Sequence, residues 1–166
     1  MSKLNFTIRP FAAADLAALH TIRNTAFAPV YASFRALVGP ELAPIVFAKA
    51  EDEQGKWLDT ICRPDSDHCM AVATLEDRPI GFCDYSTDAQ TRIGEIGLNA
   101  VDPDYAGKGV GTALYEHALN ELRAAGMQAA TVSTGGDASH APARRAYAKA
   151  GFAAAVPSVH LYRMLE

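Results

Sequence analysis

Apolar and polar residues alternate at the start of the chain, where residues 4–9 run Leu-Asn-Phe-Thr-Ile-Arg before Pro10. Alternation with a period of two is typical of a β-strand that buries one of its faces. Further short apolar segments predict additional strands later in the chain. The strands expected from this pattern lie at residues 4–9, 71–75, 79–85, 92–101, 127–134 and 159–165.

Other segments carry apolar residues at helical spacing. Leu16, Leu19 and Ile22 fall on one side of a helix predicted over residues 12–27. The remaining helices are expected at residues 30–62, with breaks at Gly39-Pro40 and Pro44, at residues 109–125 and at residues 142–150. Because strands and helices are interleaved, the pattern predicts an α/β or α+β class with a mixed sheet. The length of 166 residues fits a single domain over residues 1–166.

Composition and charge exclude several classes of protein. The formal net charge is −4 and no run of Lys and Arg exceeds two residues, which argues against nucleic-acid binding. No stretch reaches about 18 apolar residues, so no membrane partner is expected. The first five residues lack the core of a signal peptide, and a cytoplasmic location is expected. The three cysteines form no CxxC pair, which predicts reduced thiols and no metal site.

The stretch between the fourth predicted strand and the helix that follows it is rich in glycine. Glycine lets backbone amides approach a ligand closely, and the first amides of a helix have no partners within the helix. The helix dipole adds partial positive charge at this end, and the first acidic residue, Glu116, comes well inside the helix. These features predict a phosphate site. The residues expected around the phosphate groups are Gly107, Lys108, Gly109, Val110, Gly111 and Thr112.

Familiar phosphate motifs do not fit this stretch. A P-loop requires its lysine after the last glycine, whereas Lys108 precedes Gly109. A dinucleotide fingerprint requires a third glycine, where Thr112 or Leu114 stands. The absence of an acidic metal site beside the glycines disfavours a nucleotide phosphotransferase. A glycine-rich turn that only permits tight helix packing is the alternative to a phosphate site.

The fourth predicted strand carries one carboxylate among mostly apolar residues. Strict alternation would place Glu95 on one face with Asn99 and Val101, and Ala100 on the other face. A partly buried carboxylate beside the phosphate site is suited to act as a general base. A structural ion pair, for example with Arg92, is the alternative.

The glycine-rich stretch resembles motif A of the GNAT superfamily of N-acetyltransferases, whose core is Arg/Gln-x-x-Gly-x-Gly/Ala. Gly109 and Gly111 occupy the two glycine positions, and Asp102-Pro103-x-Tyr105 matches the usual lead-in. Ala106 stands where the family has Arg or Gln, and Lys108 is close enough in sequence to compensate for that change.

The segment 140–152 resembles motif B of the same family, written Asn-x-x-Ala-x-x-x-Tyr-x-x-x-Gly-Phe. The matching residues are Ala143, Tyr147, Gly151 and Phe152. His140 stands in the position of the asparagine. The specific resemblance covers about residues 92–152, and the order of elements agrees from Ile8 to the C-terminus.

The resemblance implies a fold and a reaction. The fold is a mixed, mostly antiparallel sheet of about six or seven strands, splayed between strands 4 and 5 and flanked by about four or five helices. The reaction is acetyl transfer from acetyl-CoA to an amine, either a small molecule or a peptide, with no metal and with a possible homodimer. Amides of residues 107–112 would hold the diphosphate of coenzyme A. The residues implied as pantetheine or other cofactor contacts are Asn99, Ala100, Val101, His140 and Ala143.

The resemblance also implies catalytic roles. Glu95 occupies the place where one branch, including histone acetyltransferases, carries its general base. Tyr147 would protonate the departing thiolate of coenzyme A, although a core tyrosine with a bonded hydroxyl is the alternative. His140 could cap its helix, contact pantetheine or relay a proton, and the first two roles are favoured because nothing near it in sequence orients its second nitrogen. A GNAT-fold module that binds acyl-CoA without catalysis is the alternative function.

Overall fold

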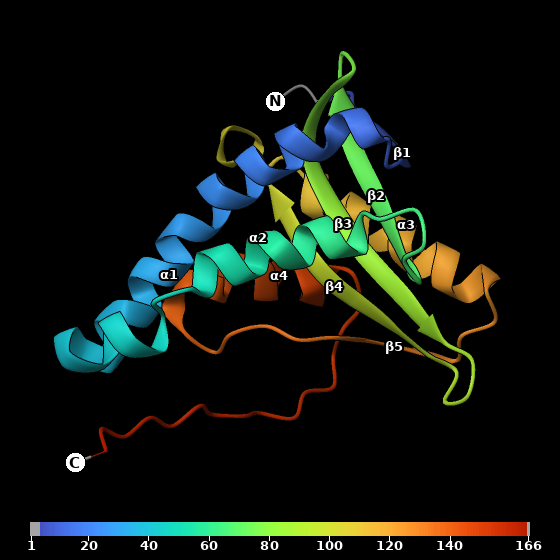
Figure 1. The fold of residues 1–166 in the computed structure, drawn as a ribbon. Helices are drawn as coiled ribbons and strands as arrows, with labels where there is room; N and C mark the ends of the chain where they lie inside the picture. Colours follow the sequence, from blue (N-terminus) through green and yellow to red (C-terminus); the bar gives the residue numbers. More distant parts are fainter. Residues whose placement is uncertain (1–3, 166) are drawn as a thin grey trace.

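The computed structural model describes residues 4–165 as a mixed sheet with helices on both faces (Figure 1). The strands are β1 (Thr7–Pro10), β2 (His68–Leu75), β3 (Arg78–Asp88), β4 (Ile93–Val101) and β5 (Ala129–Val132). The helices are α1 (Leu16–Val46), α2 (Ala50–Ile61), α3 (Val110–Ala124) and α4 (Ala141–Lys149). Short 3₁₀ turns at Ala13–Asp15, Pro103–Tyr105 and Ala138–His140 precede α1, α3 and α4. The mixed class and the number of helices agree with the sequence prediction.

The sheet follows the order of the chain, β1-β2-β3-β4-β5. The first four strands pair antiparallel, whereas β5 runs parallel to β4. Only residues 93–96 of β4 pair with β5, although β4 continues to Val101. The two strands therefore part over the second half of β4. This is the splay that the resemblance implied between strands 4 and 5.

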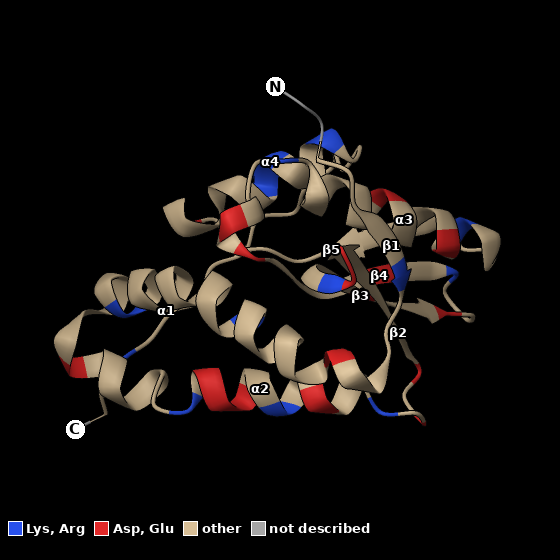
Figure 2. Cartoon of the chain, turned by 90° about the horizontal axis from the view of Figure 1, so that it is seen from above, with Lys and Arg blue, Asp and Glu red and all other residues tan. Residues whose placement is uncertain are grey.

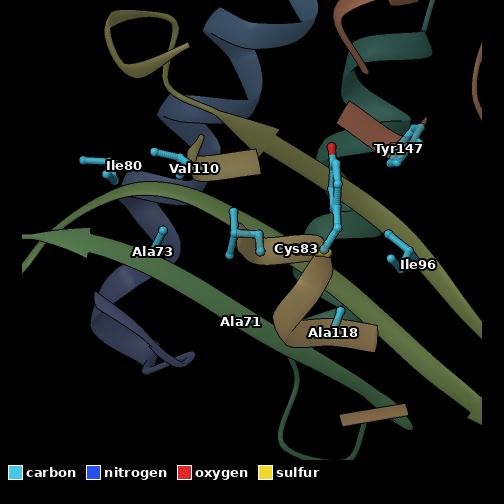
Figure 3. Close-up of a cluster of buried hydrophobic side chains, with 10 residues drawn as sticks. Ala71, Ala73, Ile80, Cys83, Ile96, Val110, Ala118 and Tyr147 are labelled. Atoms are coloured by element: carbon cyan, nitrogen blue, oxygen red, sulfur yellow. The ribbon is translucent and has the colours of Figure 1, made fainter. Parts of the chain in front are cut away.

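Two buried clusters hold the helices against the sheet. The cluster on the α3 side, part of which is drawn in Figure 3, includes Ile80, Cys83, Ile96, Leu114, Ala118 and Tyr147. The cluster on the side of α1 and α2 includes Leu19, Ile22, Leu58, Val72, Phe82 and Ala100. Burying one large apolar side chain contributes about 1.5–3 kcal/mol, so these two faces position the helices that border the site.

Helix α1 is longer than the helix predicted over residues 12–27. It continues to Val46 through Pro29, Pro40 and Pro44, and Gly39 interrupts the helical path with a φ of +84°. The break therefore falls at the expected Gly39-Pro40 position, whereas Pro29 does not end the helix. Val30 and Tyr31 are buried directly after Pro29, and this packing outweighs the hydrogen bond that proline removes.

A β-bulge in β4 reverses the predicted faces of that strand. Cys83 of β3 pairs with Asn99, but Tyr85, two residues later, pairs with Ile96, three residues earlier. The extra residue shifts side chains after the bulge to the opposite face. Ile96 and Val101 consequently share the α3 side, while Leu98 and Ala100 contact the α1 and α2 side. The prediction that Glu95, Asn99 and Val101 share one face is wrong, because strict alternation holds only without a bulge.

The segment predicted as a last strand, 159–165, has no regular secondary structure. Val159 is 81% exposed and Leu161 is 88% exposed, and Tyr162 contacts Phe47, the residue directly after α1, at 6.0 Å between ring centroids. Residues 4–165 therefore form five strands, and the expected six or seven are not confirmed. An alternating pattern becomes a strand only when a sheet edge pairs with it, and this segment leaves the sheet (Figure 1).

The acidic residues of α2 lie on the surface and are mostly paired (Figure 2). Glu51 pairs with Arg35 at 2.6 Å, Asp52 pairs with Lys56 at 2.6 Å, and Asp59 contacts His20 at 2.7 Å. These side chains form a solvated helix face, and none of the three carboxylates borders the cleft described below.

Among residues 4–165 no single helix could cross a membrane, although the helices 13–46 and 50–61, bent by 72°, together match the necessary length and composition.

Candidate active site

A cleft of about 760 Å³ opens where β4 and β5 part. Its walls come from α1, α2, the second half of β4, the loop before α3, the chain after β5, and α4. The predicted site residues that line it are Asn99, Ala100, Val101, Gly107, Gly109, Gly111, Thr112, His140, Ala143 and Tyr147. Residues predicted from two separate motifs therefore meet in one cavity, which only the tertiary structure could establish.

Three predicted residues do not line the cleft. Val110 is buried in the core with 1% of its surface exposed, so only its backbone can serve a ligand. The Lys108 ammonium donates to the Asp104 carbonyl at 2.8 Å and lies over the Tyr105 ring. It therefore interacts with its own loop. Glu95, the third, is treated separately below.

The loop before α3 has the geometry of an anion site. Gly107 and Gly109 have φ values of +73° and +87°, a region that strongly favours glycine. Gly109 is the N-cap of α3, and the first turn of that helix contains no acidic residue. The unpaired amides and the positive end of the helix dipole thus face the cleft without a competing carboxylate. The loop fits the diphosphate of coenzyme A.

Tyr147 is held in a hydrogen-bonded group with Asn99 and Tyr115. Asn99 Nδ2 donates to the Tyr147 hydroxyl at 3.0 Å and to the Gly97 carbonyl at 2.8 Å. The Tyr115 hydroxyl donates to Asn99 Oδ1 at 2.7 Å, and the two tyrosine rings lie 4.7 Å apart between centroids. The sequence prediction assigned Asn99 a backbone role only and did not include Tyr115. The sequence signal for Tyr115 is its place four residues, about one helical turn, after Gly111.

Burial keeps the Tyr147 hydroxyl protonated. The residue is 6% exposed, and this burial raises the pKa of Tyr147, although the hydrogen bond from Asn99 opposes part of the shift. A protonated phenol at the wall of the cleft can donate a proton to a group bound there. The role as proton donor that motif B implies requires such a hydroxyl and stays a prediction.

Glu95 is exposed, and it does not line the cleft. The bulge places it on the side of α1 and α2, opposite Ile96. The expected partial burial is therefore wrong. The alternative partner, Arg92, instead donates to the Gly126 carbonyl at 3.1 Å. Any role for Glu95 in proton transfer to or from the cleft would have to run through solvent.

The buried carboxylate of this region is Asp84 of β3, which the sequence prediction did not include. It is 1% exposed and lies opposite the bulge, where the Leu98 amide donates to Oδ2 at 3.3 Å. His68 Nδ1 and Asp84 Oδ1 are 2.8 Å apart. Burial raises the pKa of Asp84, and the bond from His68 lowers it in part. A side chain at Gly97 would collide with Asp84 Oδ2, so glycine is required at the bulge.

His140 is oriented by Asp137, three residues earlier. His140 Nδ1 and Asp137 Oδ1 are 2.6 Å apart, and the imidazole stacks on Phe34 of α1 at 5.6 Å between centroids. The expectation that nothing near His140 in sequence orients its ring is therefore wrong. Its side chain also makes no capping hydrogen bond to α4, which removes the capping role. Asp137 lies outside motif B, so the resemblance to that motif does not include this pair.

Side chains from the helices complete the cleft. Phe27 of α1 and Trp57 of α2 form an aromatic wall, and Arg145 and Lys149 of α4 supply positive charge. Within residues 4–165, no three His, Cys, Asp or Glu side chains gather in a way that could hold a metal ion.

The sequence matches the acetyltransferase (GNAT) family over residues 32–152. The mycothiol acetyltransferase of Sanguibacter keddieii is 38% identical over 90 residues, which cover 51% of this chain and 28% of that protein. The chain thus spans less than a third of the length of this curated relative.

Solved structures share the fold at low sequence identity. The PaiA N-acetyltransferase of Thermoplasma acidophilum, in complex with coenzyme A, is 18% identical with a TM-score of 0.67 over 90% of each chain. The aminoglycoside acetyltransferase meta-AAC0020 from an uncultured soil metagenomic sample, in complex with sisomicin, is 18% identical with a TM-score of 0.62 over 97% of each chain.

Proposed function

Because the chain belongs to the acetyltransferase (GNAT) family, we propose that it transfers the acetyl group of acetyl-CoA directly to the nitrogen of an amine. One observation carries this proposal: the glycine loop at the start of α3 and the buried hydroxyl of Tyr147 line the same cleft. The loop suits a diphosphate, and the hydroxyl suits a leaving group that needs a proton. The solved complex of the PaiA N-acetyltransferase with coenzyme A supports the choice of donor.

The proposed reaction uses groups on both sides of the cleft. Backbone groups of Asn99, Ala100 and Val101 pair with the pantetheine and polarise the thioester carbonyl, whose oxygen gains charge as the amine attacks. Tyr147 protonates the departing thiolate. The sequence predicts Glu95 as the base, but Glu95 is exposed and does not line the cleft, so the proposed reaction assigns it no contact with the amine. Holding both substrates in one cleft supplies the proximity that the reaction requires.

The acceptor is proposed to be a small molecule or a peptide that carries an amine. Phe27 and Trp57 offer apolar contact area at the wall formed by α1 and α2. Because the fold is shared with the acetyltransferase solved with sisomicin, aminoglycosides belong in the first panel of amines. A homodimer and a cytoplasmic location stay predictions.

A second candidate function is a module that binds acyl-CoA without catalysis. The observation in its favour is Ala106 in the Arg/Gln position of motif A, which removes one side-chain contact to the diphosphate. The well-formed setting of Tyr147, with its hydroxyl bonded to Asn99 at 3.0 Å, favours an enzyme.

The test is turnover with a panel of amines, measured as free thiol released from acetyl-CoA and as acetylated product by mass spectrometry. Product together with stoichiometric thiol supports acetyl transfer. Calorimetric binding of acetyl-CoA without any product supports the binding module, and absence of both binding and product contradicts both functions.

A further inference from the structure

The pair formed by Asp137 and His140 is built from three separate parts of the chain. Asp137 and His140 begin and end the turn before α4, and their side chains are only 11% and 16% exposed. Ser33 of α1 donates to Asp137 Oδ2 at 3.0 Å, and Ser139 donates to the same oxygen. Arg144 of α4 donates to the Asp137 carbonyl at 2.7 Å. Such a number of contacts fixes the carboxylate before any ligand binds.

The backbone also makes room for this pair. A side chain at Gly135 would collide with His140 Nδ1 and with Asp137 Oδ1. The carboxylate is kept in its charged form: burial by itself would raise the pKa of Asp137, but hydrogen bonds from Ser139, His140 and Ser33 lower it below its ordinary range. An ionised carboxylate beside Nδ1 favours the tautomer that carries its proton on that nitrogen.

The other ring nitrogen is therefore the reactive one. In the part of the chain that the structure describes, the hydrogen bonds of this imidazole all involve Nδ1. His140 lines the cleft, as does Tyr147 of α4, seven residues later. Phe34 stacks on the ring and holds its plane. With Nδ1 protonated, Nε2 keeps its lone pair and can accept a proton.

We propose that His140 is the general base of the acetyl transfer and that Asp137 is its positioning residue. This inference rests on the proposed acetyl transfer. The nitrogen of the amine forms a bond to the acetyl carbon while His140 Nε2 takes the proton that this nitrogen loses. The C–S bond then breaks, and the sulfur receives the Tyr147 hydroxyl proton. The imidazolium returns its proton to solvent, the tyrosinate recovers one from solvent, and neither residue is changed overall.

The two carboxylates of this region, Glu95 and Asp84, are less suited than His140 to act as the general base. Glu95 is exposed and does not line the cleft. Asp84 is 1% exposed, and both of its oxygens already accept hydrogen bonds, from His68 and from the Leu98 amide. His140 combines a place at the wall of the cleft, an oriented ring and a nitrogen with an available lone pair.

The substitution His140→Asn separates a base from a cofactor contact. Asparagine is the residue of motif B, so it can contact the cofactor but cannot accept the proton. We expect kcat to fall roughly 100-fold or more, with the KM and the calorimetric affinity for acetyl-CoA unchanged. The matched control is His20→Asn, which removes a histidine paired with Asp59 on the outer surface of α1 and α2 and should leave kcat unchanged.

Two further measurements test the inference. The first needs no acceptor, and the second compares His140 with Glu95 as the base. Nitrogen-15 NMR of the imidazole should find the neutral ring protonated at Nδ1, and Asp137→Asn should remove that preference while circular dichroism is unchanged. Glu95→Gln should retain most of kcat. An Nε2-protonated ring, a normal kcat in His140→Asn, or a loss of kcat confined to Glu95→Gln overturns the inference. Absence of product in the unsubstituted chain overturns the proposed acetyl transfer itself, together with this inference.

Discussion

Asn99 of β4 donates a hydrogen bond through Nδ2 to the hydroxyl of Tyr147 at 3.0 Å. This bond joins the splayed half of the strand, where pantetheine is expected, to the helix that carries the proposed acid. It fixes the direction of a phenol that is itself almost fully buried. The proton donor is therefore oriented by the same residue whose backbone is proposed to bind the cofactor.

Removing this hydroxyl should affect chemistry far more than folding. For Tyr147→Phe we expect kcat to fall roughly 100- to 10,000-fold, because the thiolate then leaves without a proton donor. Stability should fall by about 1 kcal/mol, since Asn99 Nδ2 keeps its bond to the Gly97 carbonyl. Steady-state kinetics and urea unfolding measure the two effects. Tyr85→Phe, on β3 and outside the cleft, is the control, and equal kcat values for the two variants would contradict the assignment.

The two ends of α3 offer a matched test of the glycine loop. Gly109 and Gly126 have φ values of +87° and +82°, and a Cβ at either position would meet no atom within 4 Å. Asp at both positions therefore brings similar strain and the same charge. Gly109→Asp should abolish calorimetric binding of acetyl-CoA by repelling the diphosphate, whereas Gly126→Asp should leave it intact. Equal affinities in the two variants would show that the diphosphate binds elsewhere.

Asp84 predicts a specific dependence of stability on pH. Because burial raises the pKa of Asp84 above its ordinary value of 3.8, the folded chain binds this proton more tightly than the unfolded chain. The contribution of Asp84 to the free energy of unfolding must then decrease as pH rises from about 3.8 through the folded pKa. Asp84→Asn should lack this decrease. Urea unfolding of both proteins across that interval measures the difference, and parallel stability curves would refute the prediction.

The segment after Pro157 should contribute little to the stability of one chain. Val159 and Leu165 are 81% and 88% exposed. Removing residues 158–166 is therefore expected to change the free energy of unfolding by less than about 1 kcal/mol, apart from the Tyr162 contact with Phe47. Tyr162→Ala isolates that contact. A much larger loss, or a change in the mass measured by light scattering, would indicate that this segment stabilises an assembly of chains.

Local patterns were sufficient for much of the fold. The break at Gly39 and the glycine start of α3 follow from the sequence, because each depends on the conformational preferences of a few adjacent residues. The glycine loop was predicted from its resemblance to motif A, and Tyr147 from its resemblance to motif B. The segment 159–165 was misread, because an alternating pattern specifies the face of a strand and does not supply its partner.

The sequence by itself predicted most of the helices and strands, a phosphate site at residues 107–112 and Tyr147 as a candidate proton donor. Only the tertiary structure decided which side chains serve the cleft. The bulge opposite Asp84 turned Asn99 toward Tyr147 and left Glu95 on the opposite face, and a single extra residue in a strand has no signature in its composition. The Asp137 carboxylate that pairs with His140 is also held by Ser33 of α1, a contact between residues 104 positions apart. Such contacts arise from packing, which local sequence does not encode.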